Sequence, residues 1–169
     1  MSLVISNLWI SFVNGKISTE EFLSSYDGVS GTLDISKGEC RAIRSAIRDV
    51  RNQRNRNEVF DRICVALISI TSKLLVKRRF DQARILLSSI LESEETLISS
   101  SYVARLQFLY AQAFHYLKIY EKSLKQYSQS LDLFDQIGDD EAKAHCYRYR
   151  SQVLSKLNEI DSSIGECLA

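Results

Sequence analysis

Residues 116–131 read YLKIYEKSLKQYSQSL and place Tyr120, Ser123, Tyr127 and Ser130 at spacings of three and four. Residues at these spacings lie on one face of an α-helix. A helix that simply packs on a core carries Leu or Ile on such a face, whereas this one alternates aromatic rings with small side chains. Small residues let two helices cross closely while large rings fill the space beside the crossing. The stretch therefore predicts a helix that packs tightly against a second helix.

A similar pattern recurs at a constant interval along the chain. The segments RRFDQARILLSSIL (78–91), KIYEKSLKQYSQSL (118–131) and NEIDSSIGECLA (158–169) align without gaps, in equal steps (118 − 78 = 158 − 118 = 40). Each carries a large residue, a small residue three positions later, and a third residue four positions after that. These are Phe80, Ala83 and Leu87; Tyr120, Ser123 and Tyr127; and Ile160, Ser163 and Cys167. Self-similarity at a period of tens of residues is typical of stacked-repeat architectures.

A helix is also predicted upstream of each aligned segment, from a stripe of residues at helical spacing. The stripes are Leu67, Ile70, Thr71 and Leu74 in the first unit, Tyr110, Ala111 and Phe114 in the second, and Tyr147, Ser151 and Leu154 in the third. Each unit is therefore expected to form a helix, a tight turn and a second helix. Because the sequence has no proline and only six glycines, we expect an all-α protein.

This arrangement resembles the tetratricopeptide repeat (TPR) family. In that family the first helix carries Leu-Gly/Ala followed by an aromatic residue, and the second helix carries Ala and an aromatic residue. The middle unit matches best, through Tyr110, Ala111, Phe114, Tyr120, Ser123, Tyr127 and Ser130. The sequence departs from the pattern at Gln107, where the family often has Trp, and at Arg150, where an apolar residue is usual. The family's closing Pro is missing throughout, and the long period resembles the longer-repeat type of the family.

The resemblance implies a right-handed solenoid of helical hairpins over residues 57–169, with three repeats of which the last is incomplete. Residues 1–56 are then expected to form an N-terminal helical cap. In this region Ser18 and Glu21 have the spacing of a capping box at the start of a helix. The stretch NGKISTEEF resembles half of an EF-hand loop, but Ile10 and Phe12 stand where oxygen ligands are required, so calcium binding is not expected.

In the TPR family the first helices of successive repeats line a concave groove, and the resemblance implies a binding surface there. The positions carried over are Arg105, Phe108, Gln112, His115 and Tyr116 in the second unit, and His145, Arg148, Gln152 and Lys156 in the third. These cationic, aromatic and amide side chains suit a protein segment that carries carboxylates. The two-carboxylate clamp of the chaperone-binding members is absent. We therefore expect a protein–protein interaction module or scaffold that binds a segment of another protein.

Residues 37–56 form the most basic part of the sequence, with seven basic residues against Glu39 and Asp49. Four of the basic residues share one helical face: Arg41, Arg44, Arg48 and Arg51. This face is either a solvated surface balanced by acidic segments elsewhere, or a site for an acidic protein or for nucleic acid. Because no aromatic residues are interleaved for base stacking, nucleic acid is the least favoured of these alternatives.

The last unit ends in an apolar face that lacks the polar cap which closes a solenoid in water. This face consists of Ile160, Ile164, Cys167 and Leu168. Either the chain is a fragment, or this edge binds a partner or a second copy of the chain. A self-assembling structural subunit is therefore an alternative function.

Composition limits the remaining classes of function. The net charge is +1, so no overall field attracts nucleic acid or membranes. No apolar run approaches the roughly 18 residues of a membrane span, and the N-terminus has no signal-peptide pattern, so we expect a cytoplasmic protein. The four cysteines fit neither a zinc template nor a disulfide framework and are expected to be reduced and packed. They are Cys40, Cys64, Cys146 and Cys167.

The sequence offers no catalytic constellation. His145 and Cys146 are neighbours, but adjacent residues on a helix point about 100° apart, whereas a nucleophile and its base must approach within hydrogen-bond reach. We therefore expect no enzymatic activity, no cofactor and no metal site.

Overall fold

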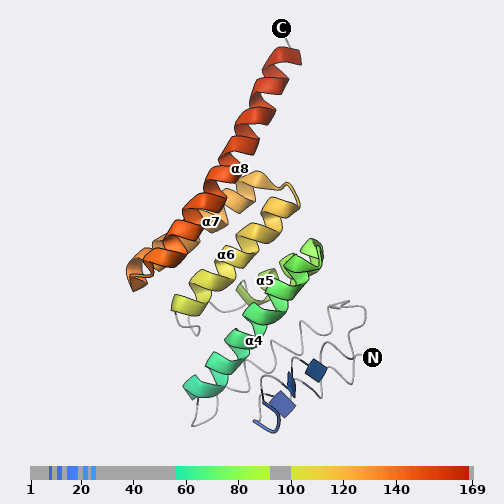
Figure 1. Cartoon of the computed structure of the whole chain (residues 1–169), viewed down its shortest axis with the longest axis vertical. Helices are drawn as coiled ribbons and strands as arrows, with labels where there is room; N and C mark the ends of the chain where they lie inside the picture. Colours follow the sequence, from blue (N-terminus) through green and yellow to red (C-terminus); the bar gives the residue numbers. More distant parts are fainter. Residues whose placement is uncertain are drawn as a thin grey trace. The chain divides into compact units, whose positions relative to one another are not determined.

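The computed structural model describes residues 56–91 and 100–167, and nearer the N-terminus residues 8, 11–12, 15–18, 21–22 and 24–25 (Figure 1). Five helices cover most of these residues: α4 (Arg56–Val76), α5 (Phe80–Leu91), α6 (Ser100–Tyr116), α7 (Tyr120–Ile137) and α8 (Asp140–Cys167). Helices that follow one another pack together, α4 with α5, α6 with α7, and α7 with α8. The prediction of an all-α protein is confirmed for the described part of the chain. The chain forms two compact units, Met1–Ile98 and Ser99–Ala169.

Three helices end in the same kind of turn. Arg78, Lys118 and Gly138 have positive φ angles of 58°, 61° and 73°. In each turn the amide of this residue donates to the carbonyl three residues earlier, and the next amide donates to the carbonyl five residues earlier, at 2.8–3.2 Å. This is the Schellman motif, which satisfies carbonyls at the end of a helix. Arg78 and Lys118 open two of the aligned segments, so the turns after α4 and α6 recur at the interval seen in the sequence.

The third predicted hairpin is not formed. α8 runs without interruption from Asp140 to Cys167, through Asn158, the residue equivalent to Arg78 and Lys118. An L-residue in the left-handed conformation costs about 1 kcal/mol, and neither Gly nor Pro stands near Asn158 to end the helix. Continuing the helix avoids this cost. The expectation of a separate second helix in the last unit was therefore wrong.

The stripe predicted for the third unit is also exposed instead of buried. Tyr147 and Leu154 are 52% and 39% exposed, and Ser151 between them is exposed. The stripes of the first two units lie on helices, as predicted, and are buried: Leu67, Ile70, Thr71, Leu74, Tyr110, Ala111 and Phe114. The difference follows from the continuous α8, because residues 158–167, which were expected to fold back over this side, extend the helix instead.

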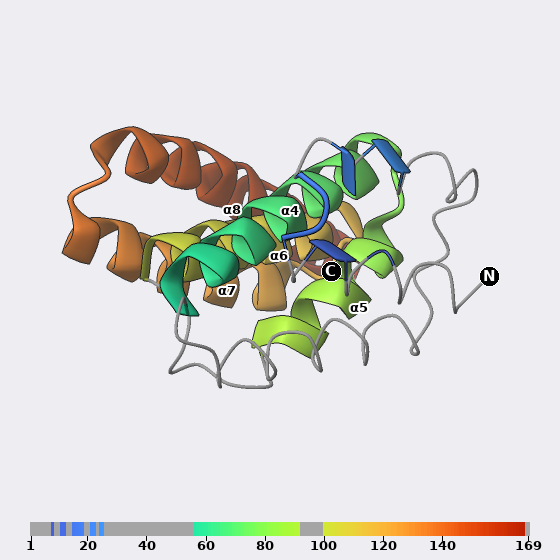
Figure 2. The ribbon, with the colours of Figure 1, turned by 90° about the horizontal axis from the view of Figure 1, so that it is seen from below.

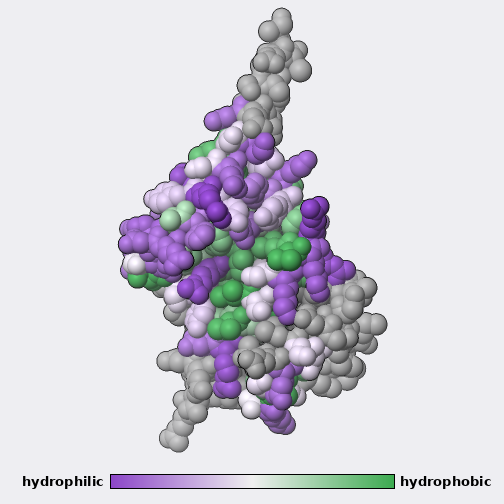
Figure 3. All heavy atoms as spheres, viewed as in Figure 1, coloured by the Kyte–Doolittle hydropathy of each residue, from purple (hydrophilic) through white to green (hydrophobic). Residues whose placement is uncertain are grey.

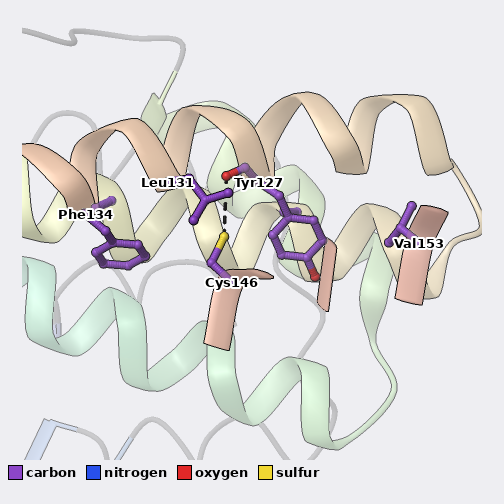
Figure 4. Close-up of a cluster of buried hydrophobic side chains, with 7 residues drawn as sticks. Tyr127, Leu131, Phe134, Cys146 and Val153 are labelled. Carbon is purple, nitrogen blue, oxygen red and sulfur yellow. Dashed lines mark hydrogen bonds between the residues drawn. The ribbon is translucent and has the colours of Figure 1, made fainter. Parts of the chain in front are cut away.

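The core of the second unit lies between α6, α7 and α8 (Figure 4). Its buried residues are Ala104, Ala111, Tyr127, Leu131, Phe134, Cys146 and Val153. Figure 2 shows α7 and α8 side by side, joined by the short turn at Gly138. Ser123, Tyr127 and Ser130 are fully buried, which confirms that the rings and serines of the opening stretch pack between helices.

In the first unit, Phe12 and Phe22 are buried and stack with their ring centroids 4.7 Å apart. The predicted capping box is confirmed. The Ser18 amide donates to Glu21 Oε2 at 2.7 Å, and the Glu21 amide donates to Ser18 Oγ at 3.1 Å. These hydrogen bonds lower the pKa of Glu21. None of the helices in the described ranges combines the length and hydropathy that crossing a membrane requires.

Candidate functional site

The two helices that were expected to carry the binding surface meet within the second unit. Phe108 of α6 and Tyr149 of α8 contact edge to face, with ring centroids 5.6 Å apart. Tyr127 of α7 lies against both, 5.8 Å from Phe108 and 6.4 Å from Tyr149. Such aromatic contacts fix the separation of the two helices. The positions predicted on α6 and on α8 therefore belong to one connected surface, the α6–α8 surface.

Most of the predicted site residues on this surface are accessible to a ligand. The exposed ones are Arg105, Tyr116, His145, Arg148, Gln152 and Lys156. Phe108, Gln112 and His115 are half-buried, and Phe108 packs on the core cluster. Phe108 therefore contacts mainly the core beneath the α6–α8 surface and exposes only part of its ring to a ligand.

Arg148 is held in a defined orientation. Its guanidinium carbon lies 5.0 Å from the centroid of the Tyr149 ring, a cation–π contact. Among the described residues no carboxylate forms an ion pair with Arg148. An exposed guanidinium in this position keeps its five N–H donors available for a carboxylate of a partner.

Arg105 differs, because it already has a carboxylate nearby. Its Nη2 lies 3.7 Å from Asp139 Oδ2, and Asp139 also accepts a hydrogen bond from the Ala142 amide at the start of α8. Asp139 therefore serves both as the cap of α8 and as a partner of Arg105. Sequence reasoning missed Asp139 and Tyr149 as parts of the site. Tyr149 stands four residues after His145 and three before Gln152, so helical spacing could have identified it.

His115 and Tyr116 stack with nearly parallel rings, their centroids 5.5 Å apart and their planes at 5°. Tyr120 lies 6.2 Å from the imidazole of His115. Burial lowers the pKa of His115, because it disfavours the charged imidazolium. His115 Nδ1 is buried and has no hydrogen-bond partner within the described ranges. The neutral imidazole therefore acts as an aromatic element of the α6–α8 surface, not as a cation.

The described cysteines are packed thiols. Cys64 and Cys146 are free and buried, which confirms for these two that the thiols are packed. Burial raises the pKa of Cys64 to about 12 and that of Cys146 to about 11, so both are neutral at ordinary pH. Cys146 Sγ donates to the Tyr127 carbonyl at 3.4 Å (Figure 4), while its neighbour His145 is exposed. Within the described ranges no cluster of His, Cys, Asp and Glu has the arrangement of a metal site.

Two further predicted surfaces fall outside the described residues. The basic face of Arg41, Arg44, Arg48 and Arg51 lies there entirely. So do the side chains of the predicted C-terminal edge, Ile160, Ile164, Cys167 and Leu168, although the backbone of α8 is described as far as Cys167.

Comparison of the chain with protein-family models, with curated proteins and with solved structures returns no match.

Proposed function

We propose that the protein is an interaction module that binds a carboxylate-bearing segment of a partner protein on the α6–α8 surface. The observation that carries the proposal is the position of Arg148, exposed, stacked on Tyr149 and without an ion-pair partner among the described residues. A guanidinium that is already oriented loses little side-chain entropy when it binds a carboxylate. It is therefore a favourable anchor for an acidic side chain.

The neighbouring residues suit the rest of such a segment. Gln152 is exposed one turn beyond Arg148 on α8, and an amide side chain both donates to and accepts from a peptide backbone. Tyr116, 45% exposed on α6, offers an apolar ring face together with a hydroxyl. Cationic, amide and aromatic side chains thus occur together, as they do on surfaces that recognise peptides.

We also propose that the chain is a TPR-like protein of the longer-repeat type. The support is the pair of Schellman turns at Arg78 and Lys118, which stand at equivalent positions of the aligned segments and are each followed by a second helix that packs on the first. In such a repeat the first helices, here α6 and α8, form the ligand-binding side. The proposed class and the proposed site therefore agree.

The proposal is tested by affinity capture from native lysate, followed by mass spectrometry. Three forms of the full chain are compared: wild type, Arg148→Glu, and Lys125→Glu as a matched control. Lys125 is an exposed cation on α7, in the same unit but not among the residues of the α6–α8 surface. Reversing its charge makes the same change in net charge as Arg148→Glu does.

We expect a defined protein to be captured by wild type and by Lys125→Glu and to be lost with Arg148→Glu. The affinity for the captured segment should then fall at least about tenfold in Arg148→Glu, the loss expected when a charged hydrogen bond of about 1.5–3 kcal/mol is removed. If the three forms capture the same proteins equally, the α6–α8 surface is not the binding site.

A further inference from the structure

Tyr127 ends in a buried hydroxyl that has no hydrogen-bond partner within the described ranges. Its side chain is 0% exposed. A buried hydroxyl without a partner has lost its hydrogen bonds to water and gained none in the protein, which destabilises the folded state. Because phenylalanine has the same ring without this group, packing alone does not explain a tyrosine at this position. The hydroxyl therefore needs a role other than packing.

This hydroxyl lies beneath the α6–α8 surface. Figure 4 shows the Tyr127 ring extending from α7 toward α8. Two half-buried rings of the surface lie against it, with centroids 5.8 Å away for Phe108 and 6.4 Å away for Tyr149. The Tyr149 ring stacks nearly parallel to the Tyr127 ring, with 17° between their planes. Because Tyr149 is partly exposed and Tyr127 is fully buried, the Tyr149 ring separates Tyr127 from the α6–α8 surface.

Arg148 lies against the same Tyr149 ring, with its guanidinium carbon 5.0 Å from the ring centroid. A group that takes the place of this ring would therefore lie within reach of both the guanidinium and the Tyr127 hydroxyl. Rotation about the side-chain torsions is enough to move a partly exposed ring. A carboxylate that binds Arg148 also draws the cation away from the ring face, which removes one of the contacts that hold Tyr149 in place.

The chemistry of Arg148 and Tyr127 suits a carboxylate. An ionised carboxylate accepts several hydrogen bonds through its two oxygens, so it can bind a guanidinium and a phenol together. Burial raises the pKa of Tyr127 above its ordinary value of 10.0, so the phenol keeps the proton that it would donate. Where Figure 3 colours α8, the surface is mostly hydrophilic with isolated hydrophobic residues, which also suits a charged ligand.

We infer that the Tyr127 hydroxyl is a second binding group of the α6–α8 surface, which donates to the same partner carboxylate as Arg148 when the Tyr149 ring moves aside. This inference rests on the proposed function, since it concerns the same site and the same ligand. In the free chain Tyr149 covers the hydroxyl, and the hydroxyl gains a partner only when the ligand binds. The site therefore selects a carboxylate over the amide of the same shape, because a hydrogen bond to a charged acceptor is stronger.

The first test needs no ligand and measures the urea concentration at which half of the full chain is unfolded. Tyr127→Phe should raise this midpoint, because it removes the hydroxyl that has no partner and keeps the ring. Tyr147→Phe is the matched control and should leave the midpoint unchanged, since Tyr147 is 52% exposed. In a Tyr149→Ala background water reaches the hydroxyl, so Tyr127→Phe should no longer raise the midpoint. If Tyr127→Phe fails to raise the midpoint of wild type, or raises it equally in both backgrounds, the inference is overturned.

The second test measures binding of the full chain to an array of synthetic peptides of about ten residues. Each peptide carries a single Glu among neutral residues, and each has a counterpart with Gln in its place. Wild type and Tyr147→Phe should bind the Glu peptides more tightly than their Gln counterparts. Tyr127→Phe should bind the same Glu peptides about tenfold more weakly than wild type, the loss expected for one hydrogen bond to a charged group.

Arg148→Glu separates failure of this inference from failure of the proposed function. If wild type does not prefer the Glu peptides, or Arg148→Glu binds them as tightly as wild type does, the proposed function is wrong and the inference is overturned with it. If Arg148→Glu loses the Glu peptides while Tyr127→Phe binds them as tightly as wild type does, the proposed function is supported and only the role of the Tyr127 hydroxyl is wrong.

Discussion

The Ser123 hydroxyl of α7 donates a 2.8 Å hydrogen bond to the Ala111 carbonyl of α6, and both residues are fully buried. Ser123→Ala removes this bond while the carbonyl keeps its place in the helix. We expect the free energy of unfolding to fall by about 1 kcal/mol, measured by urea denaturation. Ser123→Leu should cost more, about 2–3 kcal/mol, because its larger side chain has to enter a close helix crossing.

Ser128→Ala is the control for this prediction. Ser128 is half-buried on the same helix, so the substitution makes the same change in helix propensity without removing the bond to Ala111. We expect it to alter stability by less than about 0.5 kcal/mol. If both alanine variants cost the same, the hydrogen bond between α7 and α6 contributes nothing specific.

Much of the fold was predictable because local pattern and packing agree in the first two hairpins. The spacing of Ser123, Tyr127 and Ser130 predicted a closely packed helix, and all three side chains are fully buried. The same reasoning failed at Asn158. Asparagine tolerates both helical and left-handed conformations, so the sequence pattern there does not decide between a turn and a continuous helix.

The candidate site was predictable in part for a different reason. Arg148 and Gln152 were placed on one surface by the resemblance to the TPR family, and their spacing of four residues on a helix agrees with that placement. Helical spacing does not show what a side chain contacts on a neighbouring helix. The edge-to-face contact of Phe108 with Tyr149 and the pairing of Arg105 with Asp139 depend on how the helices pack, so only the structure reveals them.

The left-handed turn residues give a second prediction. Gly138 has a φ of 73°, and a Cβ added there would meet no atom within 4 Å. Gly138→Ala should therefore lower stability by about 1 kcal/mol through backbone strain alone. Lys118→Gly should raise stability, but by a smaller amount. Glycine relieves the strain at the φ of 61°, and its greater flexibility in the unfolded chain offsets part of that gain. Thermal denaturation measures the change in stability of each variant relative to wild type. If both variants change stability in the same direction, backbone strain does not decide the stability of these turns.

Burial of Cys146 gives a prediction at alkaline pH. Its pKa rises from 9.0 to about 11 in the folded protein, so folding favours the neutral thiol. The resulting stability is fully present below pH 9 and is lost as the pH rises toward 11, because the unfolded chain ionises first. We expect a loss of up to about 2 kcal/mol over this interval. In urea denaturation, the Cys146→Ala variant should lose less stability than wild type over the same pH range. If the two proteins show the same pH dependence, ionisation of this thiol does not cause the loss.

His115 gives a prediction of the opposite sign at acidic pH. Burial lowers its pKa below the ordinary value of 6.5, so the folded protein favours the neutral imidazole that stacks on Tyr116. This stability is present above pH 6.5 and is lost as the pH falls toward the folded pKa, because the unfolded chain takes up the proton first. Carboxylates also titrate at lower pH, so the informative quantity is the difference between wild type and His115→Gln. Urea denaturation should show that wild type loses more stability than the variant between neutral pH and pH 5.5. If the two pH profiles run parallel, the imidazole is as easily protonated in the folded chain as in the unfolded one, and the stacked pair does not depend on its neutral form.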